Sequence, residues 1–413
     1  MTYGQQQSVT IDFGAPLKPA MQRASGFLNS ITAHEPEDRY LQSLKPRLFR
    51  LAPSDALDVD LHRRLTGFGA IIQCVISDAS GAYGNPHVTQ KWPGDHDDWT
   101  EWERLVEDLV KEAQTKGLSV QWDIWNEPDY PPFWGRTAEQ FNEAWKRAFL
   151  KIRSLDPNAI IVGPSLSRGP WHYLYKFLLV AKENNAVPDI VSWHDYALDH
   201  PDDISHVRTF LETYGIGNRP ISLNEIKNED KYSPGIIVWW LTHVEEQGAD
   251  SAAYACWQDS AGYSDCVQPT LDGLLTLEGQ PRAAWFAHRE YASIPGELVQ
   301  VGSAGKTITG LAGLNKELRL AHILLGRREF PDAPAISNVE VLLRHLDGSG
   351  LMSGEGNVFV RAARIPDSGT AVLEDMVVTL EKEYSSVNGS VRIELPDFGP
   401  GEAYSIHLSQ TKK

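Results

Sequence analysis

The chain has 413 residues, 42% of them hydrophobic and 23% charged, and a formal net charge of -17. This length exceeds one ordinary core, and among single domains the α/β barrels routinely reach about 250 residues. The composition excludes disordered, collagen-like and coiled-coil classes. Because no basic stripe offsets the negative charge, nucleic acid and anionic membrane surfaces are not expected partners.

The N-terminal segment MTYGQQQSVTIDFG lacks the basic and apolar regions of a secretory signal. As written, the chain is therefore predicted to be cytoplasmic, and secretion is the alternative if a signal peptide was removed. No apolar run reaches the roughly 18 residues of a membrane span. Cys74, Cys256 and Cys266 match neither a disulfide framework nor a zinc ribbon, so free thiols are expected.

Short apolar runs alternate with amphipathic stretches from residue 22 to residue 292, the pattern of βα units around a parallel sheet. Eight strands are predicted, and most are nearly continuous apolar runs, as strands buried on both faces should be. They are SGFLNSI near residue 25, PRLFRLA from Pro46, GAIIQCVIS from Gly69, LSVQWDIWNE from Leu118, AIIVGPS from Ala159, DIVSWHDY from Asp189, PISLNEI from Pro220 and SAAYACWQ from Ser251.

The clearest helical patterns lie between the middle strands. Apolar residues recur at helical spacing over residues 97–117 until Gly117 ends the pattern. The next helix follows Thr137, an expected N-cap, and ends before Pro157. Eight strand and helix repeats favour a closed (β/α)₈ TIM barrel, and no glycine-rich phosphate fingerprint supports a dinucleotide fold.

From about Leu298 the chain changes to short strands separated by Gly, Pro, Asp and Asn. This pattern predicts an antiparallel β-sandwich over residues 298–413, possibly joined by an N-terminal strand at residues 7–14. The expected architecture is an α/β protein in which a (β/α)₈ barrel over residues 22–292 is followed by this C-terminal sandwich.

The motif WNEPD, residues 125–129, closes the fourth predicted strand. Barrel enzymes carry their active sites at the carboxyl ends of the strands, so Asn126 and Glu127 are predicted to face the mouth of the barrel. Trp125 and Trp134 are expected to form part of an aromatic surface that stacks on sugar faces and raises the carboxyl pKa. The alternative is a structural Asn-Glu-Pro turn at the start of a helix.

A second glutamate, Glu225, ends the seventh predicted strand in PISLNEI. Alone it would also suit a loop-capping role. Two carboxyl groups about 5 Å apart suit a retaining double displacement, in which one attacks the anomeric carbon and the other protonates the leaving oxygen. We therefore predict a retaining glycoside hydrolase with Glu127 as general acid/base and Glu225 as nucleophile.

Further strand ends supply candidates for substrate binding. His194 and Tyr196 alternate onto one face of the sixth strand, and the Tyr196 hydroxyl is predicted to hold the nucleophile. Arg50, on the second strand, is predicted to pair with Glu225 and lower its pKa. Trp257, on the eighth, is predicted to stack on a sugar ring. The alternative roles are a core histidine for His194, a salt bridge at the barrel rim for Arg50 and a core tryptophan for Trp257.

Weaker candidates rest on strand-end position alone: Gln73, Asp78, Gln258 and Asp259. The histidines show no HExxH or comparable metal spacing, and neither GxSxG nor a Walker loop occurs. No metal or cofactor is therefore expected, and the expected partner is a carbohydrate. The oligomeric state stays open.

The motifs WNEPD, LNE and HDY and the tail GLLTLEGQPRAAWFAHREY at residues 273–291 resemble glycoside hydrolases of clan A. Their order is most similar to family 39, which includes β-xylosidases and α-L-iduronidases and appends a β-sandwich to the barrel. The resemblance covers residues 22–292 and extends more loosely through the sandwich. It implies that Glu127 is the acid/base, that Asn126 binds the sugar 2-hydroxyl and that Glu225 is the nucleophile.

The same resemblance maps the family's sixth-strand pair onto His194 and Tyr196 and its second-strand arginine onto Arg50. Two features depart from it: Asp123 stands where related enzymes more often carry glutamate, and SGFLNSI lacks the glycine and histidine pattern of β-xylosidases. The favoured function is β-xylosidase-like exo action on plant or microbial oligosaccharides and polysaccharides. The alternatives are an endo-acting hydrolase of the clan, a non-catalytic carbohydrate-binding barrel, and an interaction protein that uses the sandwich.

Overall fold

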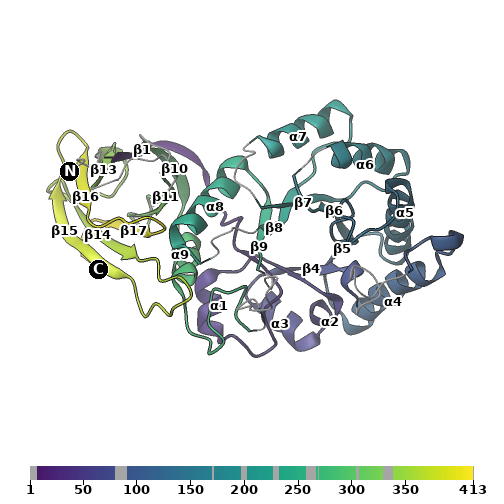
Figure 1. The fold of residues 1–413 in the computed structure, drawn as a ribbon. Coiled ribbons are helices and arrows are strands. Elements are labelled where there is room, and N and C mark those ends of the chain that lie inside the picture. The colour runs from purple at the N-terminus through teal and green to yellow at the C-terminus, as the bar shows by residue number, and fades with distance from the viewer. Residues whose placement is uncertain are drawn as a thin grey trace, which may run out of the picture. The chain divides into compact units, whose positions relative to one another are not determined.

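The computed structural model describes residues 7–79, 91–169, 172–196, 202–226, 232–256, 267, 269–303, 307–328 and 338–412. The chain divides into two compact units (Figure 1). The barrel unit consists of Arg23–Lys227 and Val244–Asp272, and the sheet unit consists of Met1–Gln22, Asn228–His243 and Gly273–Lys413.

The barrel unit is a parallel barrel whose strands follow one another in chain order around a closed ring, with eight strands in the part of the chain that the structure describes. The predicted (β/α)₈ barrel is therefore confirmed. The strands are β2 (Gly26–Leu28), β3 (Leu48–Leu51), β4 (Ile71–Val75), β5 (Gln121–Asp123), β6 (Ile160–Leu166), β7 (Ile190–Asp195), β8 (Ile221–Ile226) and β9 (Ser251–Tyr254).

Helices surround the barrel strands (Figure 1). The described helices up to β9 are α1 (Asp38–Leu44), α2 (Pro53–Ala56), α3 (Val59–Gly67), α4 (Thr100–Lys116), α5 (Ala138–Leu155), α6 (His172–Glu183), α7 (Asp203–Thr213) and α8 (Pro234–Gln247), with short 3-10 turns at Ile76–Asp78 and Asp95–Asp97. Two caps match the sequence pattern. Gly117 ends α4 in the left-handed conformation, and the Thr137 side chain accepts a hydrogen bond from the Gln140 amide at the start of α5.

The barrel closes where β2 pairs with β9 through Phe27 and Tyr254. Gly26 makes this close approach possible, because a Cβ atom there would lie 2.2 Å from the Ala252 carbonyl oxygen. We expect Gly26→Ala to lower the free energy of unfolding by about 1–3 kcal/mol, the usual cost of overpacking. Urea denaturation would measure it. Gly67→Ala is the control, since no atom lies within 4 Å of its Cβ position, and an equal effect of both changes would contradict the closure argument.

The sheet unit contains a mixed sheet, nine-stranded over the described residues, in the order β15-β14-β17-β12-β11-β10-β1-β13-β16. The strands are β1 (Gln7–Pro19), β10 (Glu297–Ser303), β11 (Ile308–Asn315), β12 (Leu320–Arg327), β13 (Val339–Arg344), β14 (Asn357–Ile365), β15 (Val377–Ser385), β16 (Val391–Leu395) and β17 (Ala403–Ser409). The expected β-rich second domain is confirmed. Its sheet is mixed because β1 runs parallel to β13 while its pairing with β10 is antiparallel.

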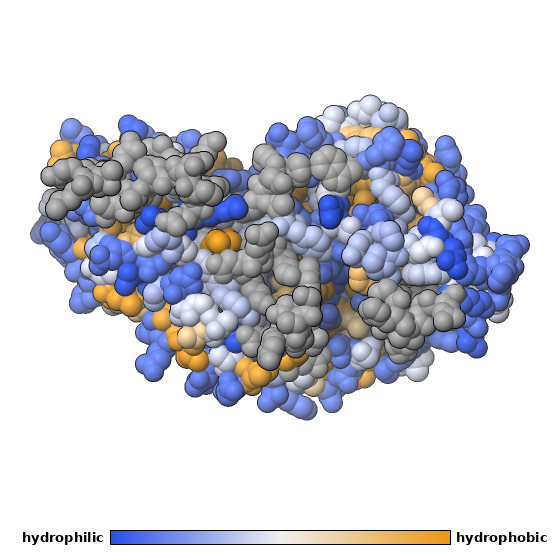
Figure 2. Space-filling model, in the orientation of Figure 1, coloured by the Kyte–Doolittle hydropathy of each residue, from blue (hydrophilic) through white to orange (hydrophobic). Residues whose placement is uncertain are grey.

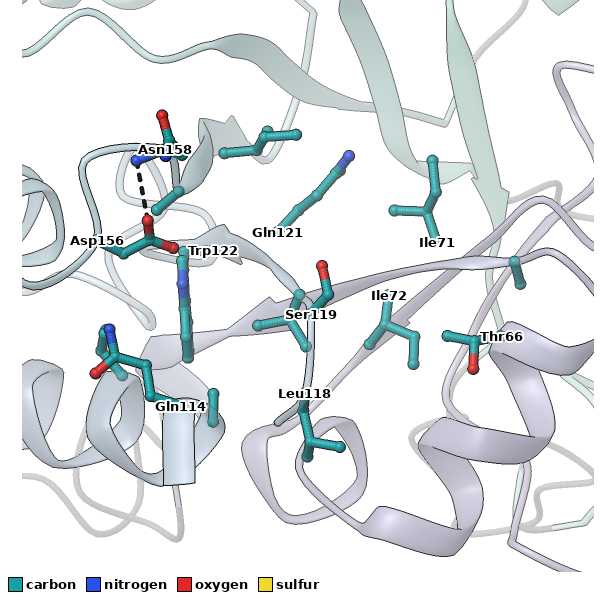
Figure 3. Close-up of a pocket in the computed structure, with 16 residues that line it drawn as sticks. Thr66, Ile71, Ile72, Gln114, Leu118, Ser119, Gln121, Trp122, Asp156 and Asn158 are labelled. Atoms are coloured by element: carbon teal, nitrogen blue, oxygen red, sulfur yellow. Dashed lines mark hydrogen bonds between the residues drawn. The ribbon is translucent and has the colours of Figure 1, made fainter. Parts of the chain in front are cut away.

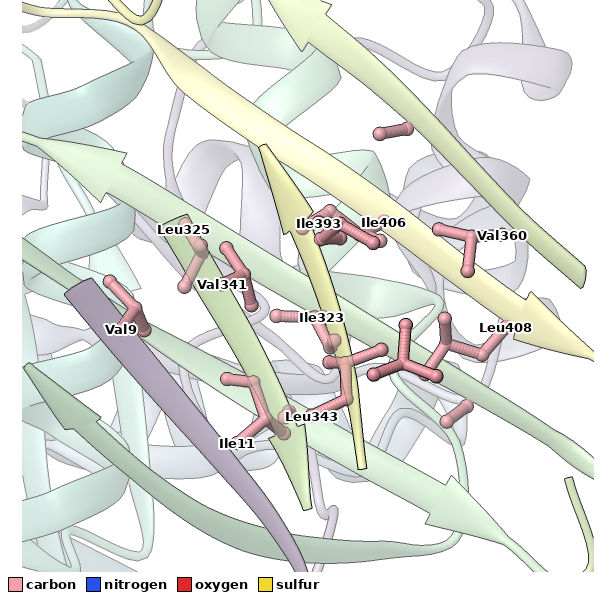
Figure 4. Packing of buried hydrophobic residues seen from close by; sticks show 14 of the residues in the cluster. Val9, Ile11, Ile323, Leu325, Val341, Leu343, Val360, Ile393, Ile406 and Leu408 are labelled. Atoms are coloured by element: carbon pink, nitrogen blue, oxygen red, sulfur yellow. The ribbon is translucent and has the colours of Figure 1, made fainter. Parts of the chain in front are cut away.

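Alternate residues of these strands meet in one hydrophobic core (Figure 4). Val9 and Ile11 of β1 lie in it beside Val341 and Leu343 of β13. The N-terminal strand thus contributes to the same core as strands more than 300 positions later in the chain. The surface in Figure 2 is mostly hydrophilic, with hydrophobic residues scattered over it.

The predicted domain ranges differ from the division into units. The range 22–292 was assigned to the barrel, whereas residues 228–243 and helix α9 (Ala283–Ala292) group with the sheet unit. Hydrogen bonds explain this grouping: the Gly235 amide donates to the Gly401 carbonyl, and the Ser405 hydroxyl donates to Glu290 of α9. The N-terminal strand is also longer than the predicted 7–14 and reaches Pro19.

The expectation of free thiols is wrong for Cys256, which is disulfide-bonded to a partner outside the described residues. Cys74 is free and buried. The prediction failed because the spacing of the three cysteines matches no recognised disulfide framework. Among the helices in the described ranges, none combines the length and apolar character needed to cross a bilayer.

Candidate active site

The carboxyl ends of four barrel strands gather the predicted catalytic and binding residues. Arg50 lies on β3, His194 on β7 and Glu225 on β8, while Glu127 follows β5 in a turn. Glu127 has a φ of 51°, and its amide donates to the Ser165 carbonyl at 2.9 Å. This left-handed turn is strained for a residue with a side chain and is typical of positions under functional constraint.

The two glutamates face each other at close range. A carboxylate oxygen of Glu127, a carboxylate oxygen of Glu225 and a ring nitrogen of His194 all lie within 4.8 Å of one another. Glu127 is 7% exposed and Glu225 is 8% exposed, so both are buried but reachable. Retaining glycosidases hold their carboxyl groups about 5–5.5 Å apart, whereas inverting enzymes leave a wider gap for water.

Arg50 connects Glu225 to the fourth strand. Its guanidinium donates to Asp123 at 2.8 Å, to Glu225 at 3.1 Å and to the Asn126 side-chain oxygen at 2.9 Å. The contact between Arg50 and Glu225 is the ion pair that was predicted from the sequence. Because Arg50 occupies the oxygen of the Asn126 amide, the amide NH₂ is the part of this side chain that can donate to a sugar hydroxyl.

Tyr196 lies elsewhere than predicted. Its hydroxyl donates to Glu127 at 2.8 Å rather than to Glu225, which corrects the expectation that it holds the nucleophile. His194 Nδ1 lies 2.9 Å from Glu127 and 3.4 Å from Glu225. The physical reason is that the turn after β5 brings the Glu127 carboxylate to the end of β7. The alternation of side chains along a strand does not predict the course of this turn.

These contacts set the pKa values of the pair in the substrate-free site. Burial raises the pKa of Glu225 above its ordinary value, although His194 and Arg50 oppose the rise. Burial also acts to raise the pKa of Glu127, but hydrogen bonds from His194 and Tyr196 and the charge of Arg50 outweigh it, so that pKa is lowered. The expected elevation of the Glu127 pKa is thus contradicted, and an acid role requires substrate binding to bring the proton to Glu127.

The Tyr196 hydroxyl provides a test of this arrangement. Tyr196→Phe removes one donor that stabilises ionised Glu127, so the pKa of Glu127 should rise. A general acid works while it is protonated, and we therefore expect the basic limb of the kcat/KM profile to move to higher pH. A pH–rate series on an aryl glycoside would measure it. A shift of the acidic limb instead would mean that Tyr196 acts on the nucleophile.

The predicted aromatic platform is largely buried. Trp125 is 0% exposed and Trp134 is 3% exposed. Their rings pack edge to face with centroids 4.9 Å apart, and their indole N–H groups donate to backbone carbonyls. Both therefore support the loop after β5 from inside rather than presenting a face to a sugar. The Tyr130 side chain is 47% exposed, and its ring centroid lies 6.0 Å from that of Phe133. Tyr130 is therefore the aromatic residue of this loop whose ring is open to a ligand.

Trp257 and the four weaker candidates complete the set of predicted positions. Trp257, Gln258 and Asp259 lie outside the described residues. Gln73 is buried, donates to Gln121 at 3.1 Å and is the cross-strand neighbour of Arg50. Asp78, at the end of the 3-10 turn after β4, accepts a hydrogen bond from Ser77, and it lies near enough to Arg50 and Glu225 for their charges to act on its pKa.

A polar network beneath the glutamates was not predicted. The Ser165 hydroxyl donates to Asp123 at 2.8 Å, and the Asn224 amide donates to both Asp123 and Ser165 at 2.9 Å. Asp123 thereby anchors Arg50 and the strand that carries Glu225. Asn224 directly precedes Glu225 in the LNE motif, so the sequence could have indicated its place in the site. Ser165, in the sequence GPS, cannot be distinguished from a turn serine by sequence.

A separate pocket of about 500 Å³ lies at the opposite end of the strands (Figure 3). It is lined by Ile71, Gln121 and Ile160, the first residues of β4, β5 and β6, and the carboxyl group among its lining residues belongs to Asp156. Active sites of barrel enzymes lie at the carboxyl ends of the strands. The candidate site is therefore the pit around Glu127 and Glu225.

A closed parallel barrel with two facing glutamates at the carboxyl ends of its strands resembles the active-site arrangement of barrel-type glycoside hydrolases. Comparison with known proteins agrees: the model of glycosyl hydrolases family 39 matches residues 75–213. The resemblance to family 39 and clan A predicted from the motifs is confirmed.

Among curated proteins, a β-xylosidase of Caldicellulosiruptor saccharolyticus is 23% identical over 288 residues, which are 60% of this chain and 58% of that protein. The chain thus spans little more than half the length of this relative. Among solved structures, a protein of Neocallimastix frontalis has a TM-score of 0.81 at 22% identity, covering 98% of this chain and 100% of the other. A monomeric β-xylosidase from Caulobacter crescentus has a TM-score of 0.70 at 18% identity, again covering 98% and 100%.

Proposed function

We propose that this protein is a retaining glycoside hydrolase with Glu225 as nucleophile and Glu127 as general acid/base. The observation that carries the proposal is the approach of the two buried carboxylates to within 4.8 Å. The Arg50 guanidinium, 3.1 Å from Glu225, favours ionised carboxylate there and disfavours a metal cation between the glutamates.

The first step needs an attack and a protonation. The Glu225 carboxylate attacks the anomeric carbon while Glu127 gives its proton to the glycosidic oxygen, so the alcohol leaves and a glycosyl ester forms on Glu225. Loss of the Glu225 charge then lowers the pKa of Glu127. In the second step Glu127 takes a proton from water, the water attacks the anomeric carbon, and Glu225 leaves as a carboxylate.

The substrate class that we favour is a β-xyloside, cleaved from the end of an oligosaccharide. Relatives described as β-xylosidases support this choice. The Asn126 amide, oriented by Arg50, supplies a donor suited to the sugar 2-hydroxyl. Endo action on a polysaccharide is the competing possibility, because the loops that would shape a pocket or a groove lie largely outside the described residues.

A panel of nitrophenyl glycosides and xylo-oligosaccharides, with products analysed by mass, tests the proposal. We expect hydrolysis of β-xylosides with release of single sugars. Release of mixed internal fragments would indicate endo action. Binding of sugars without any hydrolysis across the panel would favour the non-catalytic carbohydrate-binding alternative.

We further propose that the protein works in an oxidising compartment. The support is the disulfide at Cys256, since disulfides persist mainly in secreted and periplasmic proteins. This favours the secreted alternative over the cytoplasmic expectation. Thiol counting on protein purified from its native host, with and without reductant, would measure the bond.

A further inference from the structure

One carboxyl group beside the pit has no part in the proposed chemistry. Asp78 ends the 3-10 turn that follows β4, and β4 lies in the barrel between β3, which carries Arg50, and β5, which leads to Glu127. The Asp78 side chain is exposed, whereas Glu127 and Glu225 are 7% and 8% exposed. A ligand in the pit therefore reaches Asp78 more easily than either glutamate.

The charges that act on Asp78 place it near the proposed nucleophile. Desolvation by the surrounding protein raises the pKa of Asp78 to about 6. The positive charge of Arg50 opposes this rise, and the negative charges of Asp123 and Glu225 add to it. A side chain that is exposed and yet close to these buried charges lines a depression rather than an open surface. At neutral pH the Asp78 carboxyl is mostly ionised, so it acts as a hydrogen-bond acceptor.

A short chain of hydrogen bonds holds Asp78 next to Asn126. The Asn126 amide donates to the Ser77 hydroxyl at 3.1 Å, and this hydroxyl donates to Asp78 at 3.2 Å. Ser77 is fully buried, so the link between the two residues is fixed inside the protein. Asn126 is the residue suited to the sugar 2-hydroxyl. Asp78 therefore lies beside the sugar that is attacked rather than beside the leaving group.

The Asp78 carboxylate keeps most of its capacity to accept hydrogen bonds. Asp123, in the same pit, accepts hydrogen bonds from three protein side chains. Among the described residues, Ser77 alone donates to the Asp78 side chain, although an ionised carboxylate offers about four acceptor positions. Two neighbouring hydroxyl groups of one sugar ring can donate to the two oxygens of such a carboxylate.

We infer that Asp78 binds hydroxyl groups of the sugar that Glu225 attacks, and that it selects uncharged sugars over uronic acids. The inference rests on the proposed function and adds a specificity-determining residue to it. An ionised carboxylate accepts hydrogen bonds and does not donate them, so it favours hydroxyl groups at this position. A sugar carboxylate there would face a like charge, because the Arg50 guanidinium is already engaged by protein carboxylates.

The test combines Asp78→Ala with the removal of single hydroxyl groups from the substrate. The full chain and the variant are assayed on 4-nitrophenyl β-xyloside and on its 3-deoxy and 4-deoxy analogues. A hydrogen bond to a charged group contributes about 10- to 100-fold, so kcat/KM of the variant should fall by that factor on the parent glycoside. The variant should lose little more on the analogue that lacks the bound hydroxyl, whereas the unaltered chain should lose the full factor. A merely structural role would leave the deoxy penalties unchanged.

Two further variants sharpen the comparison. Asp78→Asn keeps the size of the side chain and one acceptor oxygen, so its deoxy penalty should be intermediate, and it decides the question if Asp78→Ala fails to fold. Asp60→Asn changes an aspartate of α3 whose side chain is 67% exposed. This matched control should behave as the unaltered chain does on every substrate.

Calorimetry with D-xylose and D-glucuronate tests the selection by charge. The preference of the unaltered chain for xylose should fall about 10-fold or more in Asp78→Asn, because the like charge is removed. An unchanged preference would refute the selection by charge. Equal deoxy penalties in the unaltered chain and in both Asp78 variants would overturn the sugar contact, while hydrolysis itself would still uphold the proposed function.

The binding measurement separates this inference from the proposed function. Xylose binding that is lost in Asp78→Ala, in a chain that hydrolyses none of the glycosides, would support Asp78 as a sugar-binding residue and refute the proposed hydrolysis. A chain that neither hydrolyses the glycosides nor binds xylose would overturn both.

Discussion

Glu225→Ala is expected to reduce turnover by more than about 10⁴-fold, because removal of a nucleophile eliminates the covalent pathway. Added azide should restore part of the activity by attacking the anomeric carbon from the vacated side. The product would be a glycosyl azide of configuration opposite to the substrate, which NMR can assign. The observed approach of Glu225 to Glu127 leaves room for a small anion after truncation.

The control for this experiment is Glu37→Ala, whose side chain is 67% exposed on the barrel unit. It should retain full activity and give no glycosyl azide. Near-normal hydrolysis by Glu225→Ala would show that Glu225 is not the nucleophile. Azide rescue with retained configuration would likewise contradict the assigned role.

Glu127→Gln should divide substrates according to their leaving groups. General acid–base catalysis contributes about 10²–10⁴-fold, so hydrolysis of a xylo-oligosaccharide should fall by that factor. Dinitrophenol needs no proton to depart, and the first step on its glycoside should be little affected. The second step still lacks its base, so the ester on Glu225 should accumulate. Rapid mixing would then show a burst of dinitrophenol before a slow steady state.

Mass spectrometry of the burst product should find one sugar attached to Glu225. The Tyr196→Phe variant is a useful companion, because it keeps the carboxylate and removes the hydroxyl that contacts Glu127 and the His194 ring. Equal loss of activity on good and poor leaving groups, with no burst, would mean that Glu127 orients substrate or maintains the turn after β5.

The barrel was predictable because its strands are buried on both faces and read as unbroken apolar runs. The positions of Glu127 and Glu225 at the carboxyl ends of barrel strands were predictable as well, since each glutamate closes a predicted strand. The partner of Tyr196 was not predictable. Its position depends on how far the loop after β5 rises above β7, and strand alternation carries no such information.

The buried state of Trp125 shows a related limit. An aromatic residue beside a catalytic glutamate suggests stacking on sugar, yet the ring packs against Trp134 and donates to a backbone carbonyl. Sequence patterns do not distinguish these roles. The parallel pairing of β1 with β13 depends on sheet order, which links segments far apart in the chain.

The stereochemical course of hydrolysis tests the central claim most directly. NMR of the anomeric proton in the first minutes of the reaction reports the configuration of the sugar before it mutarotates. Carboxylates within 4.8 Å of each other predict that a β-glycoside first yields the β-sugar. First release of the α-sugar would require a single displacement by water and would contradict the roles assigned to Glu127 and Glu225.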